Sequence, residues 1–521
     1  MEEFELIAKT FMGLEPVLAQ ELTELGANNV QIGRRMVSFT GNKEMMYRAN
    51  FQLHTAIRIL KPIAHFKAQS AEDMYTEVRK IDWSKYIEEG KTFSVDSVVY
   101  SNEFRNSRFV TYKVKDAIVD QFREETGKRP NISVTNPDIR LNIHIAEFDA
   151  TLSLDSSGDS LHRRGYRQES VAAPLNEVLA AGMILMSGWK GETDLIDPMC
   201  GSGTIAIEAA LIARNISPGV FRKEFAFEKW PDFDQSLFDE IYNDDSRERE
   251  FNHHIYGYDI DMKAVNTARI NAKAAGLSRD ITFDCRDFKD FKKPTEKSVI
   301  ITNPPYGERI STPDLLATYR MIGERLKHEF MGNEAWILSY REECFRQIGL
   351  KPSIKIPLYN GSLECEFRRY QLFDGKLNVF RHEGGVVKTD QEKAEMAQQH
   401  RFKKNREFKQ LLDQRSDNEE GDIRSFTFHK FERDDHHFSR PDRKPFRRRE
   451  RDDDEPRKGG QYGERDKWSR NGDRKVPGKR WGERGGRDRR DDRRDGFRGE
   501  KRGQSGFKKN ANYKDFSEYE D

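Results

Sequence analysis

The sequence predicts an α/β protein with three successive parts. From about residue 170, apolar runs of strand length alternate with longer helical patterns, which indicates a parallel sheet joined by helical crossovers. Before residue 155, strands and helices follow one another in mixed order, as in α+β units. Beyond about residue 385, apolar periodicity ends and Arg, Lys, Asp, Glu and Gly dominate, so we expect residues 385–521 to form a disordered, charged tail.

Length and composition exclude several classes of protein. A chain of 521 residues can bury two or three sizeable cores. Its formal net charge is only +1, but this value averages over a body of ordinary charge content and a highly charged tail. The four cysteines are scattered without a Cys-x-x-Cys pair, which argues against a disulfide framework and a zinc site. The acidic start lacks a signal-peptide pattern, and no run approaches the roughly 18 apolar residues of a membrane span. We therefore expect a soluble, cytoplasmic protein without a bound metal.

The region before residue 155 contains two groups of predicted elements. The first is a small α+β unit whose first helix ends at Gly26. Its elements are a strand at 4–10, a helix at 14–26, strands at 28–35 and 36–41, and a helix at 42–56. The second group comprises a helix at 71–81, a strand at 92–100, a helix at 108–126 and strands near 132–136, 138–147 and 148–156.

Five parallel strands and a final antiparallel hairpin are predicted after residue 170. The hairpin strands, 353–359 and 364–373, are joined by Asn360-Gly361, a dipeptide that favours a two-residue primed turn. Residues 215–252 are too long for a plain crossover, and we expect an inserted element beside the site. The parallel strands are predicted at 193–199, 254–260, 281–285, 298–305 and 334–340. This order is that of a Rossmann-like methyltransferase domain.

The first of these strands runs into a turn that contains glycine. Asp197 lies four residues before Gly201, and Gly203 comes just before a helix. Two glycines at such a turn let the backbone approach a ligand, and the helix N-terminus offers free N–H groups. The turn lacks the spacing of a phosphate loop and the third glycine of the dinucleotide fingerprint, which favours a ligand without a pyrophosphate. A packing turn without a ligand is the alternative.

Acidic residues follow the next two strands. Asp259 can accept hydrogen bonds from both ribose hydroxyls of a nucleoside, and Asp261 is either its alternative or a helix N-cap. Asp287 can accept from an adenine amino group while the backbone N–H of Phe288 meets the ring. Asp287 could also be only a turn residue. Together with the glycine turn, these positions predict a site for a cofactor that contains adenosine.

The fourth strand ends in Asn303-Pro304-Pro305-Tyr306, at the edge where open α/β sheets bind ligands. An exocyclic base amine is a poor nucleophile because its lone pair is delocalised into the ring. The Asn303 side-chain oxygen and the Pro304 carbonyl could accept its hydrogens and free the lone pair for methyl transfer. The prolines fix that carbonyl, and Tyr306 offers a face on which an extracted base can stack. A proline-rich turn without catalysis is the alternative.

Cations and an aromatic ring precede the parallel sheet. His162, Arg163, Arg164, Tyr166 and Arg167 follow one another closely, a mixture suited to the phosphates and bases of RNA. The alternative is a solvated linker.

The tail combines Arg-Gly pairs with aromatic residues. Its aromatic rings could stack on bases, as in segments that hold RNA loosely. Interleaved acidic residues leave a solubility or spacer role open. The residues in question are Tyr462, Trp468, Trp481 and Phe497, with the arginines of 484–494.

These motifs resemble those of a known family. Asp-Pro-Met-Cys-Gly-Ser-Gly-Thr at 197–204, Gly-Tyr-Asp-Ile-Asp at 257–261 and Asn-Pro-Pro-Tyr-Gly at 303–307 resemble the THUMP-domain class I RNA methyltransferases. The stretches 114–120 and 160–167 strengthen the likeness, which covers about residues 1–380. Within the family, the similarity is greatest to bacterial enzymes that form N2-methylguanosine in 23S ribosomal RNA.

The resemblance implies a ferredoxin-like unit at 1–60, a THUMP RNA-binding domain at 45–155 and a methyltransferase domain at 160–380. Larger relatives carry a second methyltransferase module, and because this chain continues into a charged tail we expect that second activity to be absent.

The resemblance also implies a cofactor and a reaction. The target amine would be held at Asn303. The alternatives are a tRNA guanine-N2 methyltransferase, an N6-adenine or glutamine-amide methyltransferase, and a non-catalytic RNA-binding assembly factor. The cofactor would be S-adenosyl-L-methionine (SAM), bound at Asp197, Gly201, Gly203, Asp259 and Asp287.

Overall fold

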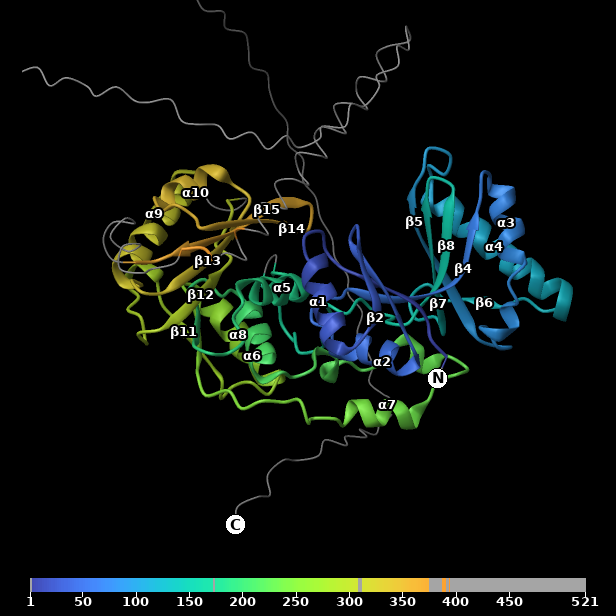
Figure 1. Cartoon of the computed structure of the whole chain (residues 1–521), viewed down its shortest axis with the longest axis horizontal. Helices are drawn as coiled ribbons and strands as arrows, with labels where there is room; N and C mark the ends of the chain where they lie inside the picture. The colour runs from blue at the N-terminus through green and yellow to red at the C-terminus, as the bar shows by residue number, and fades with distance from the viewer. Residues whose placement is uncertain (1, 172–173, 308–311, 374–386, 390–392, 394–521) are drawn as a thin grey trace, which may run out of the picture. The chain divides into compact units, whose positions relative to one another are not determined.

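The computed structural model describes residues 2–171, 174–307, 312–373, 387–389 and 393. The described strands form two sheets, one of eight strands and one of seven (Figure 1). The eight-stranded sheet is built before residue 156 and the seven-stranded sheet after residue 193. The predicted α/β class, with a mixed region before a largely parallel sheet, is confirmed.

The N-terminal sheet runs without interruption through both predicted N-terminal units. Its strand order is β2-β3-β1-β4-β8-β7-β5-β6. Period-two burial marks its strands: along β7, Ile139, Leu141, Ile143 and Ile145 are buried while the residues between them are less so. The strands are β1 (Phe4–Lys9), β2 (Asn28–Gly33), β3 (Met36–Gly41), β4 (Arg58–Lys67), β5 (Thr92–Tyr100), β6 (Asn131–Ile132), β7 (Ile139–Ala146) and β8 (Asp149–Asp155).

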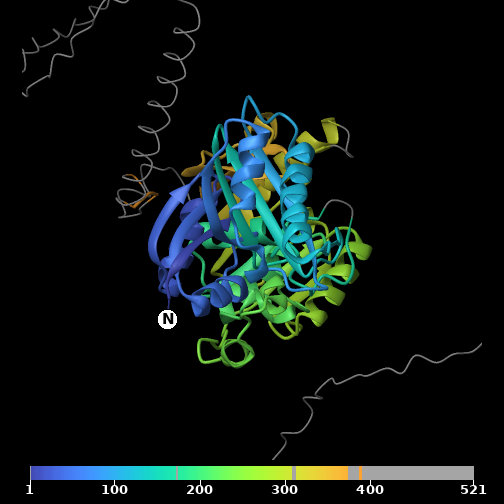
Figure 2. The ribbon, with the colours of Figure 1, turned by 90° about the vertical axis from the view of Figure 1, so that its right-hand side faces the viewer.

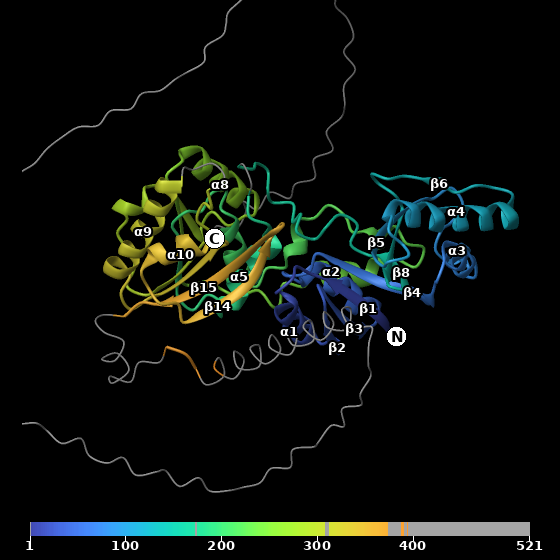
Figure 3. The same cartoon turned by 90° about the horizontal axis from the view of Figure 1, so that it is seen from above.

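The helices of this region begin and end at residues suited to capping. Asn42, Ser70 and Asn106 each accept a backbone N–H three residues ahead, and Gly26 ends the first helix at a φ of 94°. The helices are α1 (Glu15–Leu25), α2 (Lys43–Gln52), α3 (Ala71–Arg79), η1 (Trp83–Lys85) and α4 (Ser107–Thr126). Helices α3 and α4 pack side by side, in light blue and cyan in Figure 2 and labelled in Figure 3.

A central strand of this sheet is missing from the sequence prediction. The predicted helix continues to residue 56, but α2 ends at Gln52 and the chain then enters β4, which lies between β1 and β8. The register with β8 shifts between Pro62 and Ala64, a position where the missing N–H of proline is tolerated. Two successive residues, Ile59 and Leu60, are also buried. The two adjacent buried residues and the register shift together break the alternation that identifies a strand.

The second sheet has the predicted order of parallel strands followed by an antiparallel hairpin. Its order is β11-β10-β9-β12-β13-β15-β14, and β15 runs antiparallel to both neighbours. The hairpin loop is Gly361-Ser362, one residue later than predicted, because Asn360 still pairs with Leu363. The strands are β9 (Asp194–Asp197), β10 (Ile255–Asp259), β11 (Ile281–Cys285), β12 (Ser298–Thr302), β13 (Glu334–Ser339), β14 (Ile354–Asn360) and β15 (Leu363–Gln371).

Crossover helices bring the carboxyl ends of β9, β10 and β12 to one edge of this sheet. All residues from Glu177 to Ile184 in α5 are buried, so this helix lies within the core. The helices are α5 (Glu177–Ser187), α6 (Thr204–Arg214), α8 (Met262–Ala274), η4 (Phe288–Asp290), α9 (Thr312–Glu329) and α10 (Glu342–Ile348).

The insertion 215–252 does not lie beside the site, and this prediction is wrong. It forms η2 (Pro218–Phe221), η3 (Ala226–Lys229) and α7 (Gln235–Tyr242). These elements pack on α2: the rings of Phe227 and Tyr47 stack at 4.3 Å, and the backbone N–H of Asp234 donates to the Tyr47 hydroxyl. The insertion thus extends the N-terminal core, because its aromatic side chains bury area there.

Apart from residues 387–389 and 393, the predicted tail lies outside the described residues, as do its aromatic and arginine positions. Every helix in the described part of the chain is too short or too polar to cross a membrane.

Candidate active site

The turn after β9 contains two glycines with different roles. Gly203 precedes α6 at a φ of 82°, and a Cβ there would lie 2.8 Å from the ring of Phe283, so packing alone requires glycine. Gly201 has a φ of 55°, and among the described residues its Cβ would meet only the Val171 side chain, at 4.0 Å. Gly201 is therefore the position that leaves space for a ligand over the turn.

Asp197 links β9 to β12 beneath this turn. Its carboxylate accepts the Thr302 hydroxyl at 2.9 Å and the Met199 backbone N–H at 3.3 Å. Burial raises its pKa to about 7, although both hydrogen bonds favour the charged form. Asp197 thus fixes the distance between the glycine turn and the end of β12. A direct contact between its carboxylate and a ligand stays a prediction.

Asp259 lies at the tip of β10 and closes the turn from the other side. One carboxylate oxygen accepts the Gly201 N–H at 2.9 Å, and the other accepts the Asp261 N–H at 2.9 Å. Asp261 caps α8 by accepting the Lys263 N–H, so the alternative role weighed for it is confirmed. The sequence analysis did not predict a role for Ile260, whose apolar side chain is 71% exposed beside Asp259.

The third acidic position stands at the end of β11. Asp287 is half-buried, accepts the Lys289 backbone N–H and forms an ion pair of 2.9 Å with the Lys289 ammonium. Burial acts to raise the pKa of Asp287, but these contacts with Lys289 hold it below its usual value. The ring of Phe288 packs into the core, which leaves only its backbone for the predicted contact.

The segment Asn303-Pro304-Pro305-Tyr306 follows β12 directly. Pro304 is buried, and Asn303 is partly exposed at the sheet edge. The Tyr306 hydroxyl donates to the Asn303 side-chain oxygen, and burial raises the Tyr306 pKa. The ring of Tyr306 meets Tyr340 edge-on, with centroids 5.5 Å apart. The acceptor predicted for an amine is therefore occupied here by the neighbouring hydroxyl.

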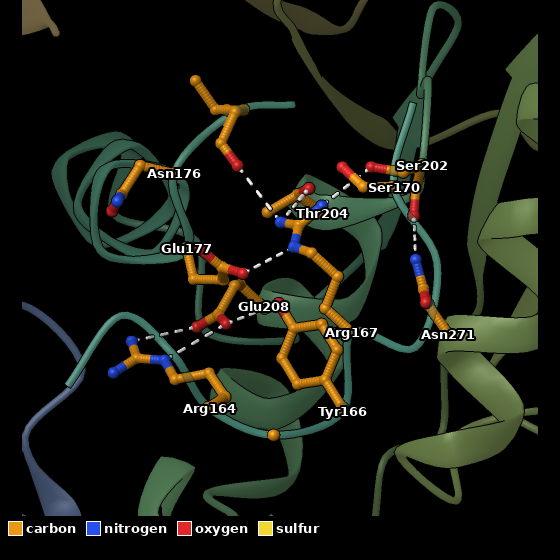
Figure 4. Close-up of polar contacts among 12 residues, drawn as sticks. Arg164, Tyr166, Arg167, Ser170, Asn176, Glu177, Ser202, Thr204, Glu208 and Asn271 are labelled. Atoms are coloured by element: carbon orange, nitrogen blue, oxygen red, sulfur yellow. Dashed lines mark hydrogen bonds and ion pairs between the residues drawn. The ribbon is translucent and has the colours of Figure 1, made fainter. Parts of the chain in front are cut away.

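The junction before α5 differs from the sequence prediction. Arg164 and Tyr166 are 2% and 1% exposed, and both bind the buried carboxylate of Glu208 on α6 (Figure 4). Arg164 also donates to the backbone carbonyls of Leu161 and His54. The prediction that these two side chains contact RNA is wrong, because their polar groups are enclosed. Arg164 joins the N-terminal region to α6 instead, and Tyr166 joins the segment before α5 to the same helix.

Arg167 is also directed inward. It binds Glu177 and the hydroxyls of Ser202 and Thr204, which lie on the glycine turn after β9 (Figure 4). Arg163 is exposed near Asp159, and His162 is partly exposed. An RNA contact by these two residues stays a prediction.

The N-terminal sheet region carries exposed aromatic rings that the sequence analysis did not propose as RNA contacts. Tyr100, Phe109, Tyr112 and Phe148 are between 46% and 60% exposed. The Lys115 ammonium lies 5.6 Å from the Tyr112 ring centroid. Exposed rings with a nearby cation are suited to stacking on unpaired bases.

Three family models match consecutive parts of the chain. The RlmL ferredoxin-like domain matches residues 5–60, and the THUMP domain matches residues 68–155. The RMKL-like methyltransferase domain matches residues 164–369.

Individual proteins are similar over the same region. A Synechocystis sp. protein, named as a candidate RNA methyltransferase, is 39% identical over 69% of this chain and 95% of its own. The ribosomal RNA large subunit methyltransferase K/L of Syntrophotalea carbinolica is 40% identical over 69% of this chain and 52% of its own. The chain thus spans about half the length of this K/L relative. The crystal structure of a candidate methyltransferase, SMU.472, complexed with SAH (S-adenosylhomocysteine), matches 72% of this chain and all of its own at 32% identity, with a TM-score of 0.65.

Proposed function

This chain belongs to the THUMP-domain class I RNA methyltransferases, and from that premise we propose that it methylates the exocyclic N2 amine of a guanosine in large-subunit ribosomal RNA. The observation that carries the proposal is the position of Asn303. It follows Thr302, which is hydrogen-bonded to Asp197 of the glycine turn. An amine acceptor and the cofactor turn are therefore tied together at one sheet edge.

SAM is the cofactor, and the residues at this edge fit it. Asp259 uses one lone pair on each oxygen for a backbone N–H, which leaves others for the two ribose hydroxyls. The space that the described residues leave over Gly201 and the N-terminus of α6 suit the methionine portion. Ile260 offers an apolar surface for the adenine ring, and Asp287 an acceptor for its amino group. When bound, SAM supplies an electrophilic methyl group.

Asn303 and Pro304 activate the amine. Their oxygens accept the two amine hydrogens, which frees the lone pair on the nitrogen. Tyr306 donates to the same Asn303 oxygen, which keeps a second lone pair for one amine hydrogen. The Tyr306 ring can stack on the base, and such a contact contributes about 1–3 kcal/mol against the few kcal/mol that base extraction costs.

Similarity to a named relative supports the choice of RNA, and the choice of guanine N2 rests on the family resemblance of the motifs alone. The K/L relative is named for large-subunit ribosomal RNA, and this chain spans only 52% of it. A tRNA guanine-N2 activity and an N6-adenine activity use the same two acceptors and are the competing assignments. A cytoplasmic location is supported by four cysteines that are all free.

The test compares wild type, Asn303→Ala and the exposed control Asn252→Ala on unmodified ribosomal RNA with labelled SAM. We expect Asn303→Ala to lose about 100-fold or more in kcat, as when one transition-state hydrogen bond is removed. Its affinity for SAH should stay within about twofold of wild type, because Asn303 serves the amine.

Two results would contradict the proposal. Unchanged methyl incorporation by Asn303→Ala would refute the role of this residue. A wild-type chain that binds SAH and RNA but methylates no RNA would favour the non-catalytic assembly factor.

A further inference from the structure

One guanidinium links the segment before α5 to the cofactor turn (Figure 4). Arg167 donates from Nε to the Glu177 carboxylate at 2.7 Å. Its Nη atoms donate to the hydroxyls of Ser202 and Thr204, both at 3.0 Å, and to a backbone carbonyl at 3.2 Å. The Arg167 and Glu177 side chains are only 18% and 6% exposed. Arg167 thereby holds the two residues that flank Gly203.

A buried amide holds the same turn from α8. Asn271 is 1% exposed, and its Nδ2 donates to the carbonyls of Ser202 and Glu169. Its Oδ1 accepts the backbone N–H groups of Gln168 and Glu169 at 2.9 and 3.2 Å. The position of the turn relative to residues 167–169 is therefore fixed by two side chains, Arg167 and Asn271.

Packing alone does not explain why a positively charged side chain occupies position 167. Helix α6 begins at Thr204, and the partial positive charge of a helix N-terminus repels a cation. Glu177 offsets this repulsion from the first turn of α5, where a carboxylate is favoured. A neutral side chain would avoid the repulsion altogether. What the guanidinium adds is a rigid planar fork that can hold two hydroxyls and a carboxylate at once.

We propose that Arg167 is a positioning residue for the cofactor: it orders the turn 201–204 before SAM binds. A turn that is ordered in advance loses less conformational freedom on binding, so affinity for the cofactor rises. The proposal rests on the proposed cofactor, and it is independent of which base or RNA is methylated.

The test uses the full chain with Arg167→Ala, Arg167→Lys and the exposed control Arg279→Gln. Calorimetric titration with SAH, without RNA, measures cofactor affinity, and steady-state kinetics separates the KM values for SAM and RNA. We expect Arg167→Ala to weaken SAH binding and raise the KM for SAM about tenfold or more, with the KM for RNA within about twofold. Arg167→Lys should recover part of the loss, and Arg279→Gln should match wild type.

A second readout addresses the mechanism in the protein without cofactor. Backbone amides of 200–206 should exchange hydrogen faster in Arg167→Ala than in wild type, because the turn is less ordered. Thr204→Val removes one acceptor, and it should weaken SAH binding in wild type but add little in the Arg167→Ala background.

Each adverse result has a distinct meaning. A folded Arg167→Ala chain with wild-type SAH affinity would overturn the proposal. A raised KM for RNA with an unchanged KM for SAM would also overturn it and would indicate that Arg167 contacts RNA. If Arg167→Ala does not fold, wild-type SAH affinity in both Arg167→Lys and Thr204→Val would overturn it. A wild-type chain that binds no SAH would reject the cofactor assignment itself.

Discussion

Replacing Glu208 by Gln should leave the Arg164 guanidinium buried without a counter-charge. The two side chains are 0% and 2% exposed, and the Glu208 carboxylate also accepts the Tyr166 hydroxyl at 2.8 Å. Removing one partner of a buried ion pair costs about 3–5 kcal/mol. We expect the lower end, because the Arg164 guanidinium also donates to the Leu161 and His54 carbonyls. For a domain of about 200 residues, about 3 kcal/mol lowers the melting temperature by roughly 6–12 °C.

Thermal and urea unfolding of the full chain, followed by tryptophan fluorescence, measures this loss. Glu77→Gln is the matched control, because it removes a solvent-exposed ion pair with Lys80 and should cost less than about 1 kcal/mol. The double variant Arg164→Met/Glu208→Gln should be more stable than Glu208→Gln alone, since no unpaired charge stays buried. A loss below about 1 kcal/mol for Glu208→Gln would refute the reasoning.

Three further outcomes are expected. Burial raises the pKa of Asp197 to about 7, so the folded state keeps a proton that the unfolded chain releases near pH 4. Stability should therefore fall between about pH 4 and 7, and Asp197→Asn should flatten this decline in urea unfolding; an unchanged slope would contradict the assignment. Tyr306→Phe frees the Asn303 oxygen and keeps the ring, so kcat/KM should be unchanged or higher, whereas Tyr306→Ala should lose roughly 5–150-fold. Equal losses in the two variants would reject the stacking role. Gly165→Ala sets a Cβ 2.0 Å from the Phe221 carbonyl oxygen at a φ of 116°, so the unfolding free energy should drop by about 2 kcal/mol, and a wild-type melting temperature would show that no such clash exists.

The methyltransferase sheet could be predicted because its signals are local. Each parallel strand is a short apolar run, and the residues with distinctive chemistry follow at its end, as Asp259 follows β10 and Asn303 follows β12. Parallel strands place such ends at one edge. The contacts from Asp259 to Gly201 and from Thr302 to Asp197 show that the edge is built as expected.

The parts that sequence reasoning missed depend on distant partners. A run of cations at 162–167 looks like a surface, and only Glu208, 44 residues after Arg164, explains why that arginine is buried. The aromatic residues of the insertion gave no sign that Phe227 would stack on Tyr47, 180 residues earlier in the chain. Strand β4 lacks the usual alternation, because Ile59 and Leu60 are both buried and the register shifts after Pro62.

Mass spectrometry of nucleosides tests the central claim most directly. Large-subunit ribosomal RNA from a strain that lacks this protein would be incubated with SAM and either the wild-type or the Asn303→Ala chain, then digested to nucleosides. The proposed function predicts that N2-methylguanosine increases with the wild-type chain alone. An increase in N6-methyladenosine with N2-methylguanosine unchanged would contradict it.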